Sequence, residues 1–359
     1  MYKILVLNLG ATSSKVSIYE DLSVKVDSVI RHSKQEMQAA PLSRDQVVYR
    51  KKMVLQWLAD NGEAMENFDA VAARGATTPE ANQGGTYLVD GKYRELLLQI
   101  YIPDEPPLHG NRIITPLALS LTEGLNIPIY VTDPTSVDEM TPKAKLSGLK
   151  GHPRRSCFHA LNHRIVARKH AAKLGKPYPE CRFVVAHMGG GISVGAHENG
   201  LVVDAGDTAE GYGPFSPERS GTISTGVMME LCYRQEITKD QFHRLVRGNG
   251  GLASHLGTSD LREVEARVDS GDQEAQLVME AMFYQIIKEI GSYAAVLKFE
   301  LDSIILTGGL AYSRRLVSRV EQYVGKLAPV AVYPGEFENE ALAAGAYRVL
   351  SGQEKAIVL

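Results

Sequence analysis

Two segments of the chain share one pattern of apolar and polar positions. Residues 4–19 and 183–197 each begin with a short apolar run, pass through a turn rich in glycine or hydroxyl groups, and continue into a second strand-like run. After the second copy, Asn199-Gly200 is a dipeptide typical of two-residue hairpin turns. Because the copies lie almost half a chain apart, we interpret them as the opening hairpins of two related domains; coincidence between two buried strands is the alternative.

Helical periodicity dominates the segments between and after these hairpins. Apolar residues recur at three- and four-residue spacing in the segments 54–58, 158–165 and 283–297. We expect a closing helix over 340–350. Further strand-like runs cover 129–133, 303–309 and 330–333. This alternation of strands and helices predicts an α/β fold built on mixed sheets.

The length of 359 residues exceeds one ordinary hydrophobic core, so about two domains are expected. We place the boundary near 148–153. The N-terminal domain then covers 1–150 and the C-terminal domain covers 151–339. A C-terminal helix, about 340–359, can pack on the first of them.

Charge and cysteine usage narrow the class of protein. Lys plus Arg is 39 and Asp plus Glu is 42, so no basic excess indicates a nucleic-acid or membrane partner. The cysteines, Cys157, Cys181 and Cys232, are odd in number and far apart, which favours a reducing compartment. No apolar run approaches the ~18 residues of a membrane span, and the N-terminal run is too short for a signal peptide. We therefore expect a cytoplasmic protein.

Three turns rich in glycine or hydroxyl groups follow strand-like runs, at 8–15, 187–193 and 307–310. Glycine lets a backbone approach a ligand closely and aim its N–H groups at phosphate oxygens. The chain has no Gly-x-x-x-x-Gly-Lys-Ser/Thr motif and no protein-kinase His-Arg-Asp loop. Each turn alone can be an ordinary turn, but the three together predict a cleft that binds nucleotide phosphates from both domains.

Two arginines stand where the backbone is restricted. Arg74 follows the apolar run 68–73 and precedes a glycine, and Arg219 lies in the loop 213–221, which contains two prolines. A surface arginine is usually only a solvated cation, but glycine and proline on both sides indicate that an arginine is held in place.

Histidines and a carboxylate also stand at turns and element ends. His109 follows two prolines, His159 begins a predicted helix, and Asp133 ends a predicted strand. Carboxylates at strand ends often bind metals in nucleotide enzymes, although Asp133 can equally cap a turn. A lone histidine is more often structural, and we assign that role to His163, His170 and His243.

Taken together, these motifs resemble butyrate kinases, within the superfamily of acetate and sugar kinases, heat-shock 70 proteins and actin. The resemblance extends from Ile4 to Leu350. The most specific segments are 186–197 (AHMGGGISVGAH) and 213–221 (GPFSPERSG), supported by 157–163, 305–309 and 334–336. Acetate kinases share only scattered polar positions with this sequence.

The resemblance implies two ribonuclease H-like domains, a duplicated actin-like ATPase fold, hinged over ATP and Mg²⁺ in an interdomain cleft. It implies reversible transfer of phosphate from ATP to a short-chain carboxylate, in the first place butyrate, which gives ADP and an acyl phosphate. A homo-oligomer, dimer or larger, is typical of such kinases.

Site residues follow from the same resemblance. The groups around the transferred phosphoryl group correspond to Arg74, Arg219, His159 and, as a second active-site histidine, His109. The carboxylates tied to Mg²⁺ correspond to Asp133, which also helps to place substrate, and Glu340. The phosphate loops correspond to Asn8, Ser13 and Lys15 in the first copy and Gly189, Gly190 and Gly191 in the second. The adenosine loop corresponds to Gly308 and Gly309.

The first loop departs from the family pattern, because Leu9 and Ala11 replace a proline and a hydroxyl residue. The first alternative is therefore a kinase for another short or branched acid: propionate, isobutyrate or acetate. A non-enzymatic actin-like ATPase and a catalytically silent relative are the others. A carboxylate, with a pKa near ~4–5, is already ionised at neutral pH, whereas a sugar hydroxyl needs a general base. Two placed arginines therefore favour a carboxylate acceptor.

Overall fold

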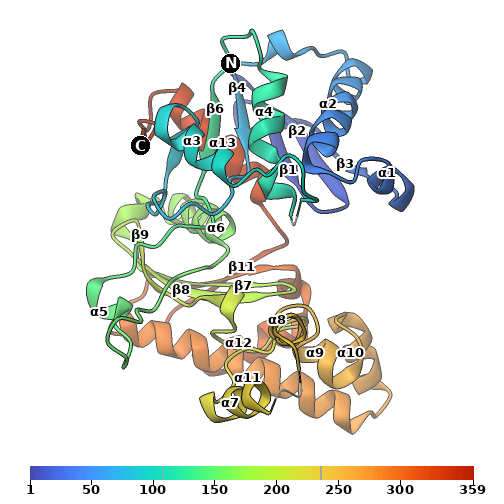
Figure 1. Cartoon of the computed structure of the whole chain (residues 1–359). Coiled ribbons are helices and arrows are strands. Elements are labelled where there is room, and N and C mark those ends of the chain that lie inside the picture. The colour runs from blue at the N-terminus through green and yellow to red at the C-terminus, as the bar shows by residue number, and fades with distance from the viewer. Residues whose placement is uncertain (108, 235–236) are drawn as a thin grey trace. The chain divides into compact units, whose positions relative to one another are not determined.

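The structure, a computed structural model, describes residues 1–107, 109–234 and 237–359. The chain divides into two compact units: unit 1 comprises Met1–Val137 and Phe337–Leu359, and unit 2 comprises Asp138–Glu336. Each unit is built on one mixed sheet with helices packed against it (Figure 1), so the predicted α/β fold class is confirmed. In this division, residues 138–150 belong to unit 2 and the C-terminal helix belongs to unit 1.

The sheet of unit 1 has the strand order β3-β2-β1-β4-β6-β5. The first three strands in sequence form an antiparallel meander, β4 and β6 run parallel to β1, and β5 is antiparallel to β6. The strand bounds are β1 (Lys3–Leu9), β2 (Ser13–Glu20), β3 (Ser23–Arg31), β4 (Ala70–Ala73), β5 (Thr86–Leu88) and β6 (Ile129–Thr132). The helix bounds are α1 (Lys34–Ala39), α2 (Ser43–Asp60), η1 (Met65–Asn67), α3 (Gly91–Gln99), η2 (Gly110–Arg112), α4 (Ile114–Leu121) and α13 (Glu338–Leu350).

Alternation along β1 directs its two faces toward different helices. Leu5, Leu7 and Leu9 join the apolar core that α2 and α4 also form. Asn8 lies on the other face and hydrogen-bonds to the first turn of α13. The C-terminal helix therefore returns to unit 1 and covers the face of its sheet opposite α2 and α4.

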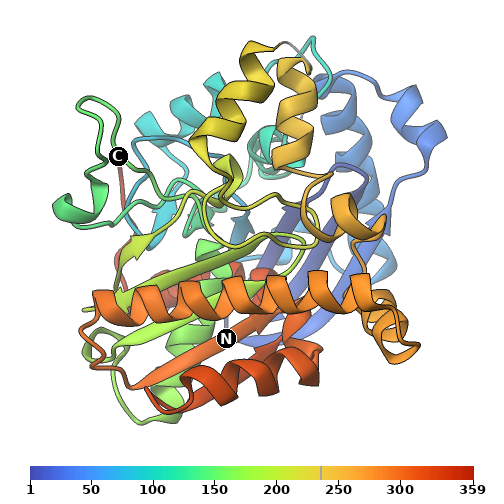
Figure 2. The ribbon, with the colours of Figure 1, turned by 90° about the horizontal axis from the view of Figure 1, so that it is seen from below.

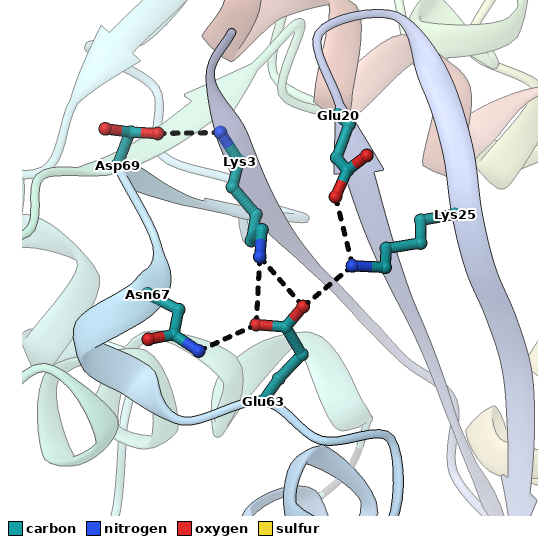
Figure 3. A network of polar contacts seen from close by, with 6 residues as sticks. All are labelled: Lys3, Glu20, Lys25, Glu63, Asn67 and Asp69. Carbon is teal, nitrogen blue, oxygen red and sulfur yellow. Dashed lines mark hydrogen bonds and ion pairs between the residues drawn. The ribbon is translucent and has the colours of Figure 1, made fainter.

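A network of charges fixes the end of this sheet that lies away from the β1–β2 turn (Figure 3). Lys3 Nζ lies 2.8 Å and Lys25 Nζ lies 3.0 Å from the same oxygen of Glu63, and Asn67 donates to its other oxygen. The hydrogen bond from Lys3 is the largest cause that lowers the pKa of Glu63 to about 2. This carboxylate therefore stabilises unit 1 at pH values above its ordinary titration range.

The sheet of unit 2 has the strand order β11-β10-β7-β8-β9. Its strand bounds are β7 (Phe183–Met188), β8 (Ile192–Glu198), β9 (Leu201–Ala205), β10 (Ser303–Gly308) and β11 (Val330–Pro334). Its helix bounds are α5 (Pro142–Lys145), α6 (Ala160–Lys173), η3 (Tyr178–Glu180), η4 (Thr208–Glu210), α7 (Thr225–Tyr233), α8 (Lys239–Val246), α9 (Gly251–Leu256), α10 (Leu261–Asp269), α11 (Gln273–Val296), η5 (Gly309–Tyr312) and α12 (Arg314–Val324). Figure 2 shows α11 lying along this sheet beside α12.

The two sheets repeat one topology. In each, an antiparallel meander of three strands is followed by two parallel strands on the far side of the first strand, so β3-β2-β1-β4-β6 corresponds to β9-β8-β7-β10-β11. The turn at Asn199-Gly200 has φ values of 54° and 75°, as a two-residue hairpin turn requires. The duplication inferred from the two hairpins is therefore present in the fold. Within the described ranges, no helix is both long and apolar enough to cross a lipid bilayer.

Candidate active site

The first predicted phosphate loop is the turn between β1 and β2. Gly10 N–H donates to Ser13 O at 2.9 Å and closes the turn. Asn8 and Lys15 lie directly opposite each other on the two strands, so their side chains share one face of the sheet. Asn8 is buried and donates to Glu338 at 2.9 Å. The turn therefore presents Asn8, Ser13 and Lys15 in one short segment of unit 1.

A buried arginine supports this turn from the opposite face of the sheet. Arg50 of α2 donates to the carbonyl oxygens of Ala11 and Ser13 and to Oγ of Ser14, at 2.9 to 3.0 Å. No ion pair to Arg50 occurs within the described residues, and burial lowers its pKa to about 10. Sequence analysis missed Arg50, because one arginine in a helix gives no signal that it is buried.

Arg74 lies directly after β4 and points to the start of α13. Its Nη1 donates to Glu338 at 2.9 Å and to Asn8 at 3.4 Å. Its buried Nε has no hydrogen-bond partner among the described residues. Glu338 is thus a candidate site residue that the sequence did not reveal. The predicted Glu340 lies in the same first turn of α13. Burial is the main cause that raises the pKa of Tyr19, and the charge of Glu340 is the second cause.

Asp133 and His109 also belong to unit 1. Asp133 follows β6 with a φ of 42°, an uncommon backbone conformation for a residue other than glycine. It is buried, and its Oδ1 accepts from Gly85 N at 2.8 Å. His109 caps η2 by accepting from Asn111 N at 3.2 Å. The next residue, Gly110, packs so closely on the carbonyl groups of the β1–β2 turn that a side chain would clash there, which brings the segment of His109 to the first loop.

The second predicted phosphate loop, Gly189 to Gly191, joins β7 and β8 in unit 2. The guanidinium of Arg219 occupies the space that a side chain at Gly191 would need. Arg219 Nη1 donates to both the carbonyl and the hydroxyl of Thr208 at 3.1 Å. The loop around Arg219 is tied to the same turn, because Ser216 Oγ donates to Gly190 O at 2.6 Å. This close approach explains why glycines form the turn.

The charge of Arg219 is not balanced by a bonded carboxylate. Among the described residues it forms no ion pair, and its backbone pairs with that of Arg247 in an isolated bridge. Burial, followed by the positive charge of Arg247, lowers the pKa of Arg219. Glu218 lies against Gly190 on the other side of the turn. A partly buried guanidinium beside glycine N–H groups is a favourable position for an anion.

His159 is the N-cap residue of α6 and lies next to the same turn. Its Nδ1 is 2.8 Å from Ser193 Oγ, and its ring stacks on that of His187 with centroids 4.0 Å apart. His187 and Ser193 face each other across β7 and β8, in the places that Asn8 and Lys15 occupy in unit 1. Sequence analysis missed His187 and Ser193, which the apolar context of their strands conceals.

The predicted adenosine loop begins where β10 ends. Gly308 has a φ of 89°, and a side chain there would overlap the backbone of Met188, so only glycine fits. Its N–H and carbonyl exchange hydrogen bonds with Gly335 at 3.1 and 3.0 Å. Gly309 opens η5 and has no atom within 4 Å of its Cβ position. Gly308 thereby brings this loop beside the end of β7 and the second phosphate loop.

The predicted residues thus form one group in each unit. Contacts within unit 1 join Asn8 to Arg74 and bring His109 to the first loop, while Asp133 lies at the end of a neighbouring strand. Contacts within unit 2 place His159, Arg219 and Gly308 around the turn of Gly189 to Gly191. No group of three or more potential metal ligands from His, Cys, Asp and Glu occurs in the part of the chain that the structure describes.

Comparison with known proteins identifies the family and confirms the fold. The model of the acetokinase family matches residues 145–357, more than half of the chain. An acetate kinase from Porphyromonas gingivalis is 20% identical with a TM-score of 0.77, over 98% of this chain and 100% of that one. A propionate kinase from Francisella tularensis subsp. tularensis SCHU S4 (17%, 0.74, over 96% and 99%) and an acetate kinase from Entamoeba histolytica (14%, 0.74, over 96% and 98%) share the fold. The chain therefore belongs to the acetokinase family, a family of phosphotransferases that use a carboxyl group as acceptor.

Proposed function

We propose that this protein transfers the terminal phosphoryl group of ATP to a short-chain carboxylate, with butyrate as the preferred acceptor, and releases ADP and butyryl phosphate. Membership of the acetokinase family supports the reaction type. The resemblance of segments 186–197 and 213–221 to butyrate kinases supports butyrate as the acceptor. Propionate, isobutyrate and acetate are the competing acceptors.

The observation that carries this proposal is the partly buried guanidinium of Arg219, which lies against the glycine turn and forms no ion pair among the described residues. The acceptor carboxylate is already ionised near neutral pH, so the reaction needs no general base. Its main barrier is the approach of one anion to the phosphates of ATP. Fixed positive charge and N–H donors that meet the developing charge lower this barrier, because they are oriented before the reaction begins.

In the proposed reaction Arg219 and His159 bind the transferred phosphoryl group, and the N–H groups of Gly189 to Gly191 bind phosphate oxygens. Gly308 and Gly309 bind the adenosine. Asn8, Ser13, Lys15 and Arg74 are assigned to the phosphates and the acceptor, and His109 to a second donor position.

Mg²⁺ suits the donors that the chain offers in unit 1. Asp133 and Glu340 are carboxylates, which Mg²⁺ prefers over nitrogen ligands, and in kinases one or two carboxylates usually hold it together with water and phosphate oxygens. A complete protein cage is therefore not required. When bound with ATP, Mg²⁺ would neutralise part of the phosphate charge.

Hydroxylamine trapping tests the proposal, because it converts an acyl phosphate into a hydroxamate, which forms a coloured complex with Fe³⁺. We expect product with ATP, Mg²⁺ and butyrate, and a higher kcat/KM for butyrate than for propionate, isobutyrate or acetate. A higher kcat/KM for one of these acids would make that acid the preferred acceptor and would leave the proposed reaction type unchanged. Hydrolysis of ATP without hydroxamate from any acid in the panel would contradict the carboxylate kinase itself and favour an ATPase.

A further inference from the structure

A chain of hydrogen bonds runs through the interior of unit 2 and ends at His159. The hydroxyl of Tyr178 lies 2.8 Å from Nδ1 of His197, whose Nε2 lies 3.3 Å from Nδ1 of His163. Nε2 of His163 lies 2.9 Å from Oγ of Ser193, and this oxygen lies 2.8 Å from Nδ1 of His159. His197, His163 and Ser193 have no exposed surface. The proposed active-site imidazole is thus linked to a phenol on the far side of a buried histidine pair.

The pleat of β8 explains how the chain is assembled. Ser193, Gly195 and His197 alternate along this strand and therefore face the same side, toward α6. His163 of α6 lies over Gly195, with its Cε1 3.5 Å from the Cβ position of that glycine. The ring lies between Ser193 and His197 and contacts both.

The chemistry of neutral imidazole leaves two possible directions for these hydrogen bonds. Burial is the main cause that lowers the pKa of His197 to about 3 and that of His163 well below its usual value. Each of the two rings is therefore neutral near pH 7, donates from one nitrogen and accepts at the other. If the bonds run toward His159, both rings carry their proton on Nε2; if they run the other way, both carry it on Nδ1.

We propose that the chain runs from Tyr178 to His159 and holds His159 in its Nε2–H form. Tyr178 donates to His197, His197 to His163, His163 to Ser193, and Ser193 to Nδ1 of His159. Nε2 of His159 then carries the proton and donates to the phosphoryl group, a role that rests on the proposed function. The other four are positioning residues, so His163 does more than the structural role that the sequence suggests.

Charges at the far end favour this direction. The guanidinium groups of Arg164 and Arg168 lie over the ring of Tyr178, 5.8 and 5.5 Å from its centroid. Positive charge there strengthens the phenol as a donor and favours hydrogen-bond dipoles whose positive ends point away from it. Glu139 pairs with Arg164 at 3.0 Å and weakens its field. The charge of Arg164 still adds to burial in lowering the pKa of His197.

The neighbouring ring has the same form. Asn162 Nδ2 lies 2.7 Å from Nδ1 of His187 and 3.2 Å from Oγ1 of Thr307. With the amide nitrogen as donor, Nδ1 of His187 accepts, so a neutral His187 carries its proton on Nε2. This nitrogen lies 3.4 Å from the Cβ position of Gly189. The two stacked imidazoles, His159 and His187, would therefore both present Nε2–H beside the second phosphate loop.

Nuclear magnetic resonance tests the tautomers without any substrate. Long-range ¹H–¹⁵N correlation on protein labelled with ¹⁵N-histidine shows which ring nitrogen carries the proton, and single His→Gln variants assign the signals. We expect Nε2–H for His159, His163 and His197 at neutral pH. A proton on Nδ1 of His159 in the unmodified protein would overturn the proposal.

A matched pair of tyrosine variants tests the coupling. Tyr178→Phe keeps the ring and removes the donor, so we expect mixed tautomers at His159 and a kcat about tenfold lower, with KM for ATP within about twofold. Tyr333→Phe removes a hydroxyl that lies 3.1 Å from Nδ1 of His170. His170 lies on α6, as His163 does, but it is not part of the hydrogen-bond chain. This variant should leave both readouts unchanged.

The outcomes separate this proposal from the proposed function. An unchanged His159 tautomer in Tyr178→Phe, or equal effects of the two variants, would overturn the coupling. If the tautomers are as expected and respond to Tyr178→Phe, but no carboxylate yields an acyl phosphate, the proposed function fails and the hydrogen-bond chain stands.

Discussion

The β1–β2 turn of unit 1 and the β7–β8 turn of unit 2 occupy the same place in two copies of one topology, yet they are supported by different chemistry. A permanently charged guanidinium, Arg50, binds the carbonyl groups of the first turn from behind. The strands that flank the second turn are linked to α6 by imidazoles, those of His163 and His187. The two turns therefore share a place in the topology, while their supports respond to different perturbations.

The predicted anion-binding arginines differ in the same manner. Arg74 in unit 1 is paired with Glu338 at 2.9 Å, whereas Arg219 in unit 2 forms no ion pair among the described residues. A paired guanidinium has part of its field cancelled, while a partly buried one without an ion pair can receive an anion. We therefore expect the second turn to bind the more highly charged part of the substrates in the proposed reaction.

The largest effect is expected from Arg219. Arg219→Ala should lower kcat/KM for acyl phosphate formation by about 10³, since it removes a cation that meets the developing charge. Stability should change far less, because the lost hydrogen bonds to Thr208 are offset by the removal of a partly buried charge. Steady-state kinetics and urea unfolding measure the two quantities. Near-normal turnover of a folded Arg219→Ala protein would exclude this residue from the site.

Arg74 provides the contrasting case. Arg74→Ala should also lower kcat/KM, but part of the loss should come from Glu338, which becomes an unpaired carboxylate in an anion-binding region. The double variant Arg74→Ala/Glu338→Gln should then recover part of the activity. If the double variant is no better than Arg74→Ala, the ion pair plays no part in the difference between the two arginines.

The next effect is expected from Arg50. Arg50→Met should lower the free energy of unfolding by about 3 kcal/mol, because it leaves two carbonyl groups of the first turn without their donor. It should also raise KM for ATP, because the turn loses its support. Lys52→Met, at an exposed position of the same helix, should change stability by less than about 0.5 kcal/mol. Similar losses in the two variants would show that Arg50 is not specially placed.

A smaller effect concerns the helix that covers the outer face of the unit 1 sheet. Gly345 of α13 packs against Thr132 of β6, and a side chain there would clash with it. Gly345→Ala should therefore cost about 1–3 kcal/mol. Gly291 of α11 in unit 2 has no atom within 4 Å of its Cβ position, so Gly291→Ala should stabilise by up to about 1 kcal/mol. Thermal unfolding compares them; stabilisation by both substitutions would show that helix propensity outweighs the close contact, and destabilisation by both would show that Gly291 is not a free position.

Most of the fold could be predicted from local patterns. Three kinds of local pattern depend only on neighbours in sequence: the short apolar runs, the Asn199-Gly200 turn and the helical periodicity of 283–297. Each forms the expected element in the structure. The closing helix begins at Glu338 rather than Glu340. Asn8 and Arg74 contact this earlier helix start from distant parts of the chain, so no local pattern could reveal it.

The candidate site was predicted in its glycines and strand ends but not in its supports. Glycine turns, and an arginine in a loop with two prolines, are visible in sequence, because backbone conformation restricts which residues fit there. Arg50, Ser193 and His197 carry no such restriction. Their roles depend on which strand face or helix lies opposite them, and that is decided by tertiary packing.

The smallest effect expected is a different response of the two units to mild acid. His163 and His197 of unit 2 have pKa values lowered mainly by burial, to about 3 for His197. Burial and then the charge of Arg50 lower the pKa of His32 in unit 1 to about 4. A histidine with a lowered pKa in the folded state stabilises above its unfolded pKa of about 6.5, and this stability is lost as the pH falls below that value.

Between pH 7 and 5.5 the two histidines should therefore lower the stability of unit 2 by about 2 kcal/mol, and the one histidine of unit 1 should have roughly half that effect. Burial raises the pKa values of Asp204, Asp207 and Glu289 in unit 2. Their protonation therefore adds stability as the pH falls further, and this sets the lowest pH at which the two units should be compared. Hydrogen exchange of amides in β7 and β1, corrected for intrinsic rates, measures each unit separately. Equal losses in both sheets would show that the neutral imidazoles do not distinguish unit 2 from unit 1.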